Sequence, residues 1–194
     1  MQGRNALVTG STRGIGAAIA EALAAEGCNV MLNGFGDADA IEAALSRMAE
    51  THGVTVAYNG ADLSNEGDVD ALTQAAEKTL GGIDILVNNA VIRYFHGIDD
   101  FPREEWNHAM AVNVTAPFIL TQNVLPGMRE RKWGRIVNFS SVLGLAARSG
   151  RSDFVVSNHA MLGLTRATAA EVRDIEGITC NAICPGSVLT PNTE

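Results

Sequence analysis

A glycine-rich stretch near the N-terminus has the residue types that cradle a phosphate group. It reads Thr9-Gly10-Ser11-Thr12-Arg13-Gly14-Ile15-Gly16, with the spacing G-x-x-x-G-x-G. Glycines allow positive φ angles and let the backbone approach a pyrophosphate closely. A helix predicted to begin at Ile15 adds unpaired N–H groups and a partial positive charge. A turn without a ligand is the alternative, but a position between a predicted strand and a predicted helix favours a dinucleotide site.

The other reactive residue types form no recognisable metal site or disulfide framework. No group of His, Cys and carboxylate residues has metal-ligand spacing, so no metal ion is predicted. Cys28, Cys180 and Cys184 contain no C-x-x-C pair, and their apolar surroundings indicate buried free thiols.

Length and composition narrow the class of protein. The 194 residues suit one α/β domain, and the apolar content of 46% with 19% charged residues excludes a disordered chain. The formal net charge of −8 argues against a nucleic-acid surface. No apolar run reaches the roughly 20 residues of a spanning helix, and no signal peptide is evident. We therefore expect a soluble cytoplasmic protein without a membrane or nucleic-acid partner.

Short apolar runs alternate along the chain with helical patterns, which must position the glycine turn. The predicted strands are 5–8, 29–32, 54–58, 83–87, 135–139 and 178–183, and the predicted helices are 15–25, 38–50, 66–79, 104–128 and 151–172. Pro117 is expected to bend or split the fourth helix. This alternation predicts a single Rossmann-like domain over 1–194: a three-layer α/β sandwich with a doubly wound parallel sheet in the order 3-2-1-4-5-6.

The motifs of the whole chain, in their order, resemble those of the short-chain dehydrogenase/reductase family. The first turn matches that family's T-G-x-x-x-G-x-G, and Asn88-Asn89-Ala90 matches its N-N-A-G motif up to the last position. Within the family, Leu32-Asn33-Gly34-Phe35-Gly36 and Trp133-Gly134-Arg135-Ile136 are similar to segments of D-3-hydroxybutyrate dehydrogenases.

The resemblance implies a bound nicotinamide dinucleotide. Asp62 and Leu63 are expected at the adenine, and Asn89 and Ala90 at the ribose. The full set of implied contact residues is Gly10, Thr12, Arg13, Gly14, Ile15, Gly16, Phe35, Asp62, Leu63, Asn89, Ala90, Pro185, Gly186 and Thr190. The second predicted strand ends without the acidic residue that binds a ribose hydroxyl in NAD sites, and Arg13 is placed to meet a 2′-phosphate. The resembled dehydrogenases use NAD, so NAD is expected, with NADP as the alternative.

The catalytic set that the resemblance implies is incomplete. Ser141 matches the serine that polarises the substrate oxygen, and Asn113 matches the asparagine that helps to hold a water relay. The family's acid/base tyrosine is replaced by Phe154, and its lysine four residues later by Asn158. Phenylalanine has no exchangeable proton, and asparagine has no charge to lower a neighbouring pKa. Val91 replaces the last glycine of N-N-A-G and crowds the nicotinamide side.

The substrate positions of the resembled dehydrogenases also differ. Arg93, Leu143, Arg151 and Ser187 stand where those enzymes have Gln, His, Lys and Trp. Arg93 and Arg151 are the candidate anion contacts. The family continues with a segment that covers the substrate and a last strand, which the resemblance places after Glu194, so this strand is expected to be missing.

Three interpretations of function remain open. The first is an active dehydrogenase of this family, opposed by Phe154 and Asn158. The second is a non-catalytic nucleotide-binding or interaction protein, and the third is an altered or shortened form of an active enzyme. We expect strongly impaired catalysis, with Tyr94 as the first surrogate base to test. A homodimer or homotetramer is also expected, through the apolar helix residues Phe118, Leu120, Met161 and Leu164.

Overall fold

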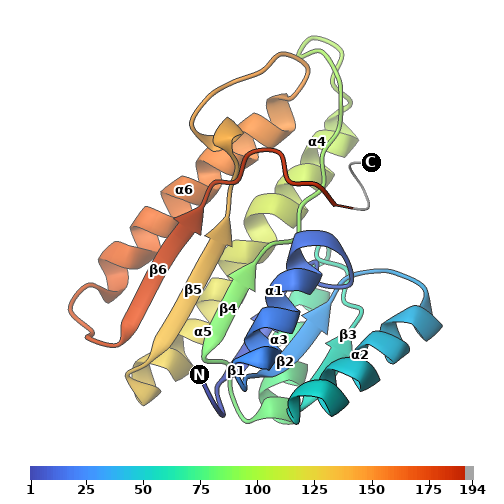
Figure 1. The fold of residues 1–194 in the computed structure, drawn as a ribbon. Coiled ribbons are helices and arrows are strands. Elements are labelled where there is room, and N and C mark those ends of the chain that lie inside the picture. The colour runs from blue at the N-terminus through green and yellow to red at the C-terminus, as the bar shows by residue number, and fades with distance from the viewer. Residues whose placement is uncertain (191–194) are drawn as a thin grey trace.

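A parallel sheet of six strands forms the centre of the computed structural model, which describes residues 1–190 (Figure 1). In spatial order the strands are β3 (Val56–Asn59), β2 (Asn29–Asn33), β1 (Asn5–Val8), β4 (Ile85–Asn88), β5 (Gly134–Phe139) and β6 (Ile178–Ile183). Every neighbouring pair is parallel. The predicted α/β class and the strand order 3-2-1-4-5-6 are therefore confirmed.

Helices cover the two faces of the sheet unequally. The first face is covered by α1 (Gly14–Ala25) and α2 (Ala38–His52), and the second by α3 (Glu66–Leu80), α5 (Ala116–Arg131) and α6 (Ser152–Val172). Each layer closes on its own buried apolar cluster. On the α1 side, β5 carries the half-buried Val137 and Phe139, and β6 carries the exposed Thr179 and Asn181. Burial by helices on this face is thus concentrated on the first four strands.

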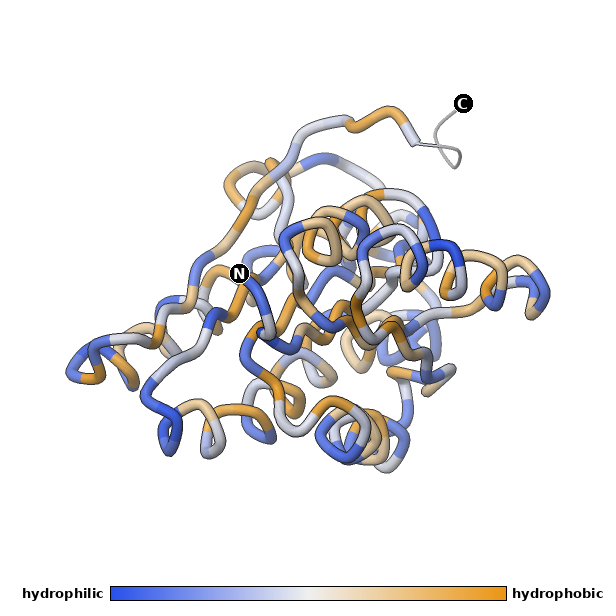
Figure 2. Tube along the Cα trace, turned by 60° about the horizontal axis from the view of Figure 1, so that its bottom comes forward, coloured by the Kyte–Doolittle hydropathy of each residue, from blue (hydrophilic) through white to orange (hydrophobic). Residues whose placement is uncertain are grey.

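Hydropathy follows these layers. Apolar residues run along the central strands, while polar residues gather at the turns and on the outer sides of the helices (Figure 2). The segment after β6 departs from this rule, because it places apolar side chains outside. Leu189 is 78% exposed in this segment, which lies above the C-terminal ends of the strands in Figure 1.

The predicted helix over 104–128 is interrupted rather than continuous. It consists of α4 (Arg103–Met110), a π-helical turn at Ala111–Thr115 and α5. The Ala116 N–H bonds to the Ala111 carbonyl, one residue further back than in an α-helix. Pro117 has no N–H to donate to the preceding turn, which is a recognised cause of such shifts. The split predicted for Pro117 is therefore found just before it.

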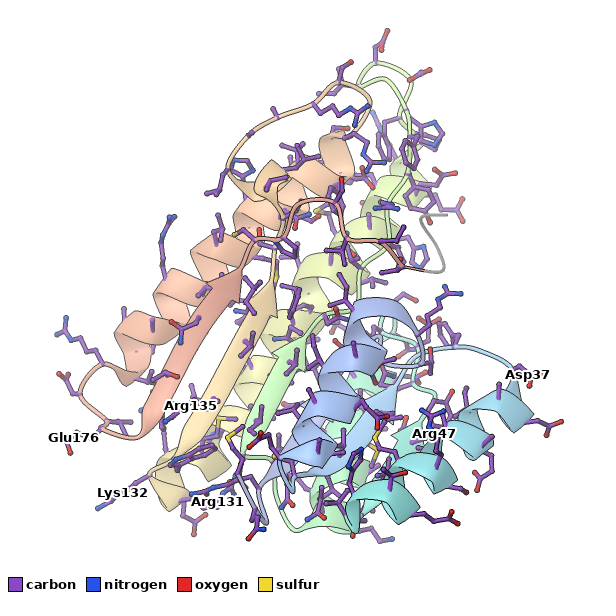
Figure 3. All side chains as sticks on the ribbon, in the orientation of Figure 1. Asp37, Arg47, Arg131, Lys132, Arg135 and Glu176 are labelled. Atoms are coloured by element: carbon purple, nitrogen blue, oxygen red, sulfur yellow. The ribbon has the colours of Figure 1, made fainter. Side chains whose placement is uncertain are left out.

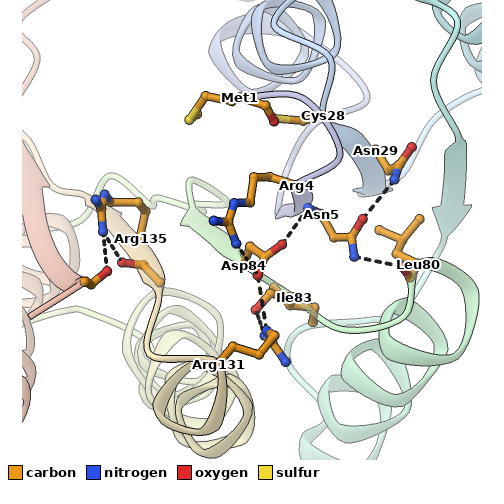
Figure 4. Close-up of polar contacts among 12 residues, drawn as sticks. Met1, Arg4, Asn5, Cys28, Asn29, Leu80, Ile83, Asp84, Arg131 and Arg135 are labelled. Carbon is orange, nitrogen blue, oxygen red and sulfur yellow. Dashed lines mark hydrogen bonds and ion pairs between the residues drawn. The ribbon is translucent and has the colours of Figure 1, made fainter. Parts of the chain in front are cut away.

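A buried carboxylate fixes the end of the sheet where the strands begin (Figure 4). Asp84 accepts hydrogen bonds from the Asn5 N–H at 3.1 Å and from Arg131 Nε at 3.2 Å. Arg4 Nη1 lies 3.6 Å from the same carboxylate. Arg131, Lys132 and Arg135 all gather at this end of the molecule (Figure 3). Asp84 thus ties the start of β1 to the end of α5.

Candidate functional site

The turn between β1 and α1 has the backbone shape that its glycines predict. Gly10 and Gly14 have φ angles of +62° and +59°. A Cβ at Gly16 would overlap the Gly10 carbonyl oxygen, so only glycine lets the helix start this close to the turn. A Cβ at Gly14 would stand in ordinary van der Waals contact with Thr190, at 3.8 Å, so the positive φ rather than lack of space favours glycine here.

The N-terminus of α1 is left free for an anion. Asp37 and Asn65 accept hydrogen bonds from the first N–H groups of α2 and α3. Helix α1 begins after Arg13 with no side-chain cap and no acidic residue in its first turn. The first N–H groups of α1 and its positive dipole end therefore lack a side-chain partner, and they lie at the glycine turn.

The segment after β4 is bonded to this turn. Asn89 Nδ2 donates to the carbonyls of Thr9 at 2.9 Å and Gly10 at 3.1 Å. Thr9 Oγ1 accepts from the N–H groups of Asn89 and Ala90. A Cβ at Gly10 would stand 2.8 Å from Ala90 Cα. Asn89 and Ala90 are thus brought to the glycine turn, as the sequence predicts.

The expected adenosine positions follow the C-terminal ends of β2 and β3. Asn33 ends β2, and its buried side chain donates to the carbonyls of Asn59 and Ala61. Thr12 Oγ1 donates to the Phe35 carbonyl at 2.8 Å, which holds Phe35 beside the turn. The Phe35 ring itself is exposed. Asp62 is exposed, and the Ser64 N–H that it accepts lowers the pKa of its carboxyl. No acidic residue stands at the end of β2, which is followed by Gly34 and Phe35.

Asn113 sits inside the π-helical turn, and its side chain is fully engaged. Its Oδ1 accepts from the Ile92 N–H at 2.9 Å, and its Nδ2 donates to the Ile92 carbonyl at 2.8 Å and to Ser157 Oγ at 3.2 Å. The side chain is buried. Asn113 therefore fixes the loop after β4 against α6.

Ser141 follows β5 at the same edge of the sheet. Its Oγ accepts from the Leu143 N–H at 3.2 Å and starts a 3₁₀ turn over Val142–Gly144. The Val142 N–H donates to the Pro185 carbonyl, so this turn is bonded to the segment after β6. That segment carries Gly186 and the exposed Ser187 and reaches Thr190, beside Gly14.

The two substituted positions lie on one face of α6, and neither side chain offers a group that can act as an acid or a base. The Phe154 ring is buried, at 9% exposure. Asn158 Nδ2 donates to the Phe154 carbonyl at 2.7 Å, back onto the helix that carries it. A narrow cavity beside Asn158 is lined by Ala90, Val91, Asn113, Pro117, Phe139, Ser157 and Met161. Val91 thus lines the same small cavity as Asn113 and Asn158.

The Tyr94 side chain is engaged by residues of the loop after β4 and of α4. Its hydroxyl oxygen lies 2.8 Å from His108 Nδ1, in a cluster of rings with His96 and Phe101. His96 Nε2 lies 2.6 Å from Glu105 Oε2. The sequence offered no signal for these pairings, because their partners lie on a different element.

Of the expected substrate positions, Arg151 lies at the start of α6. The Arg151 guanidinium carbon stands 3.9 Å from the centre of the Phe95 ring. Arg93 is exposed two residues before Phe95, and Leu143 is half-buried in the 3₁₀ turn. Sequence reasoning missed Phe95, since a single exposed ring on a loop carries no pattern.

Neither a metal cluster nor a membrane-spanning helix is found within residues 1–190. No group of three or more His, Cys, Asp or Glu residues is arranged to hold a metal ion. No helix in this part of the chain is long and apolar enough to cross a membrane.

Comparison with known proteins agrees with this architecture. Residues 4–194 match the family model of the short chain dehydrogenases. A D-beta-hydroxybutyrate dehydrogenase of Cupriavidus necator is 47% identical over 191 residues, which are 98% of this chain and 73% of that protein. The Rhizobium meliloti protein of the same name is 41% identical over 98% of this chain and 74% of its own. A Sinorhizobium meliloti 1021 crystal structure, assigned to the short-chain alcohol dehydrogenases, superposes with a TM-score of 0.92 at 31% identity. It covers all of this chain, which spans 76% of that protein.

Proposed function

The chain belongs to the short-chain dehydrogenase family of nicotinamide-dependent oxidoreductases, and we propose that it binds the dinucleotide while its hydride-transfer reaction is strongly impaired. The reaction would be hydride transfer between a nicotinamide and a small hydroxy or keto compound such as 3-hydroxybutyrate. The observation that carries the proposal is the pair Phe154 and Asn158, whose side chains offer neither a proton nor a charge.

The features at the glycine turn support this binding. The N-terminus of α1, which has no side-chain cap, would receive the pyrophosphate. The remaining residues that we assign to this site are Gly10, Thr12, Arg13, Ile15, Gly16, Phe35, Asp62, Leu63, Asn89, Ala90, Pro185, Gly186 and Thr190. When bound, the nicotinamide supplies the hydride donor or acceptor. NAD is the proposed cofactor because of the likeness to the hydroxybutyrate dehydrogenases. NADP is the alternative, because β2 ends without an acidic residue to bind the ribose hydroxyl and Arg13 in the glycine turn could meet a 2′-phosphate.

The residues of the chain can still polarise a carbonyl but cannot supply its proton. Ser141 Oγ stands at the C-terminal edge of β5, and Asn113 holds the loop that borders the site. The proton would have to come from water, without a tuned phenol. Positioned general acid–base catalysis contributes about 10²- to 10⁴-fold, and we expect a loss of at least this size. Val91 restricts the nicotinamide side further.

Titration calorimetry with NAD and NADP tests the binding half of the proposal. Micromolar binding of one dinucleotide is expected, and binding of neither overturns it. Absorbance at the nicotinamide band, with 3-hydroxybutyrate and a panel of short 3-hydroxy acids, tests the catalytic half. Turnover near 10 s⁻¹, about the median for enzymes, would contradict impairment and direct attention to Tyr94.

A non-catalytic binding protein on the same scaffold is the second candidate. It is favoured by the same two substitutions, and it differs in that the bound dinucleotide would have no reaction partner. A series of keto acids that leaves the NADH absorbance unchanged, although NADH binds, would select it over a slow dehydrogenase.

We also propose that the chain forms a homodimer or homotetramer. The Phe118 ring on α5 is 49% exposed, and a cavity of about 160 Å³ lies nearby between α3, α4 and α5. Leu120 and Met161, expected at the interface, are instead buried within the single chain, and Leu164 is half-buried. The proposal therefore depends on the exposed Phe118 ring beside this hollow. Light scattering at micromolar concentration should give at least twice the monomer mass, and a monomer would contradict the proposal.

A further inference from the structure

Two buried polar atoms between the sheet and α5 have no hydrogen-bond partner among residues 1–190. They are Asn88 Oδ1, at the end of β4, and Thr121 Oγ1, on α5. The two residues are only 2% and 5% exposed. Buried polar groups in native proteins almost always have a partner, from the protein, from water or from a ligand. These two atoms therefore need a partner that the surrounding protein groups do not supply.

The hydrogen bonds around Asn88 fix which of its atoms is left over. Thr165 Oγ1 donates its one proton to the Met161 carbonyl at 2.7 Å, so it accepts from Asn138 Nδ2, at 2.9 Å. Asn138 Oδ1 then faces β4, where it accepts from Asn88 Nδ2 at 2.8 Å. The unpaired atom of the Asn88 amide is thus the acceptor Oδ1, and its missing partner must be a hydrogen-bond donor.

Thr121 differs from other buried threonines on these helices. Thr73 and Thr165 donate to the carbonyls four residues earlier, at 3.1 and 2.7 Å, which is a common way to satisfy a hydroxyl inside a helix. Thr121 Oγ1 makes no such bond within the part of the chain that the structure describes. Its hydroxyl therefore keeps both its proton and its lone pairs for another partner.

Helix α5 runs antiparallel to β4. Pro117, near the start of α5, lines the narrow cavity beside Asn158 together with Ala90, which follows β4. Arg131, at the end of α5, donates to the carbonyl of Ile83, which precedes β4. A step from Pro117 toward the end of α5 therefore corresponds to a step back along β4 from Ala90.

These directions place Thr121 and Asn88 in one layer of the core. Thr121 follows Pro117 by four residues, an advance of about 6 Å along a helix. Asn88 precedes Ala90 by two residues, about 6.6 Å back along a strand. Leu86 and Ala90 both pack on the α5 side of the sheet, so Asn88 between them points to this side as well.

Helix α6 gives an independent check of this layer. Met161 lines the same cavity, and Thr165 lies four residues further along α6. Thr165 bonds to Asn138, which is the register partner of Asn88. The layer directly beneath the cavity therefore contains Asn88, Asn138, Thr121 and Thr165.

The polar side chains of this layer are all uncharged. Cys180 Sγ lies 3.6 Å from Asn138 Nδ2, and burial raises the pKa of this thiol to about 11. Such surroundings penalise an ion that has no counter-charge. The partner of Asn88 Oδ1 and Thr121 Oγ1 must therefore be small, neutral and able to donate as well as to accept.

We propose that one internal water molecule is bound between α5 and β4, where it donates to Asn88 Oδ1 and pairs with Thr121 Oγ1. Internal waters of this kind bridge two to four polar groups that the protein leaves unsatisfied. The water joins α5 to the end of β4, directly before Asn89, which bonds to the glycine turn. This inference does not depend on the proposed function.

A high-resolution crystal structure of the unmodified chain tests the site directly. A water oxygen should lie within about 2.5–3.2 Å of both Asn88 Oδ1 and Thr121 Oγ1. A direct hydrogen bond between the two side chains, or a layer without water at this place, would overturn the proposal.

The Thr121→Val variant removes the hydroxyl and keeps the shape of the side chain. Without the water, Asn88 Oδ1 is left without a donor, so the equilibrium constant for unfolding should rise at least about 5-fold in chemical denaturation. Oxygen-17 relaxation dispersion, which counts long-lived internal waters, should find one fewer. Thr121→Ser keeps the hydroxyl and should keep the count.

Thr73→Val is the matched control, because the Thr73 hydroxyl is buried on α3 and bonded to the Val69 carbonyl. Its water count should equal that of the unmodified chain. A Thr121→Val protein that is more stable would show that the hydroxyl had no partner, and an unchanged water count would show that it held no water. Either result contradicts the proposal. If Thr121→Val does not fold, the crystal structure of the unmodified chain decides alone.

Discussion

Phe154 and Asn158 decide the chemistry at the scale of single residues. The helix keeps both positions on one face four residues apart, so the scaffold for an acid–base pair is present without its functional groups. Asn158 has instead become part of the helix, since its amide bonds to the Phe154 carbonyl. The substitutions therefore remove chemistry without removing structure.

The double variant Phe154→Tyr with Asn158→Lys should restore turnover. A phenol and a neighbouring ammonium at these positions recreate the proton donor and the charge that lowers its pKa. We expect a gain of about 10²- to 10⁴-fold in turnover, measured by nicotinamide absorbance. Phe154→Leu with Asn158→Lys is the control that supplies charge without a proton. If the double variant binds NADH and gains nothing, Val91 becomes the limiting residue and Val91→Gly is the next change.

The three cysteines make a second prediction at this scale. Burial raises the pKa of Cys180 to about 11 and also raises the pKa of Cys28, while Cys184 is only partly buried. A thiol reagent at pH 8 should modify Cys184 first in the native protein, and all three thiols after denaturation. A fast reaction that survives in Cys184→Ser would refute this.

The same shifts have a sign in the stability of the protein. The folded chain keeps the Cys180 proton longer than the unfolded chain, whose thiols titrate near about pH 8.5. The contribution of the protonated Cys180 thiol to the free energy of unfolding is complete below that pH and is lost as pH rises toward about 11. The free energy of unfolding should fall over this window, and Cys180→Ala should reduce the decline.

At the scale of elements, local patterns in the sequence predicted the strands and helices, whereas contacts between elements were not predicted. Strand–helix alternation and turn glycines are local signals, and they predicted the sheet order that the structure confirms. The π-helical turn before Pro117 was predicted only as a bend or split, because hydropathy does not report which carbonyl accepts a bond. Tyr94 with His108 and Arg151 with Phe95 were missed, since each joins residues far apart in sequence.

Two glycine-to-alanine changes should have opposite effects. At Gly16 an added Cβ overlaps the Gly10 carbonyl, so the variant should lose dinucleotide binding and about 1–3 kcal/mol of stability. At Gly163, exposed within α6, an added Cβ meets nothing within 4 Å and should add about 0.5–1 kcal/mol. Chemical denaturation and calorimetry measure both. Gly16→Ala with unchanged dinucleotide binding would contradict the role given to this turn.

At the scale of the whole molecule, the N-terminal and C-terminal ends of the parallel strands carry different kinds of residues. The end of the sheet where the strands begin is fixed by Asp84 and the arginines around it. The end where the strands finish carries the glycine turn and the exposed apolar segment before Thr190. Binding groups are therefore concentrated at one end, and structural ion pairs at the other.

The central claim is that the molecule holds the dinucleotide without transferring its hydride efficiently. NADH fluorescence tests both halves in one experiment, because binding changes its intensity and oxidation abolishes it. We predict that the unmodified chain changes the fluorescence of NADH and that the signal then persists after 3-oxobutyrate is added. Decay of that signal at an enzymatic rate of about 1 s⁻¹ or faster, or no change on mixing with NADH, would contradict the account.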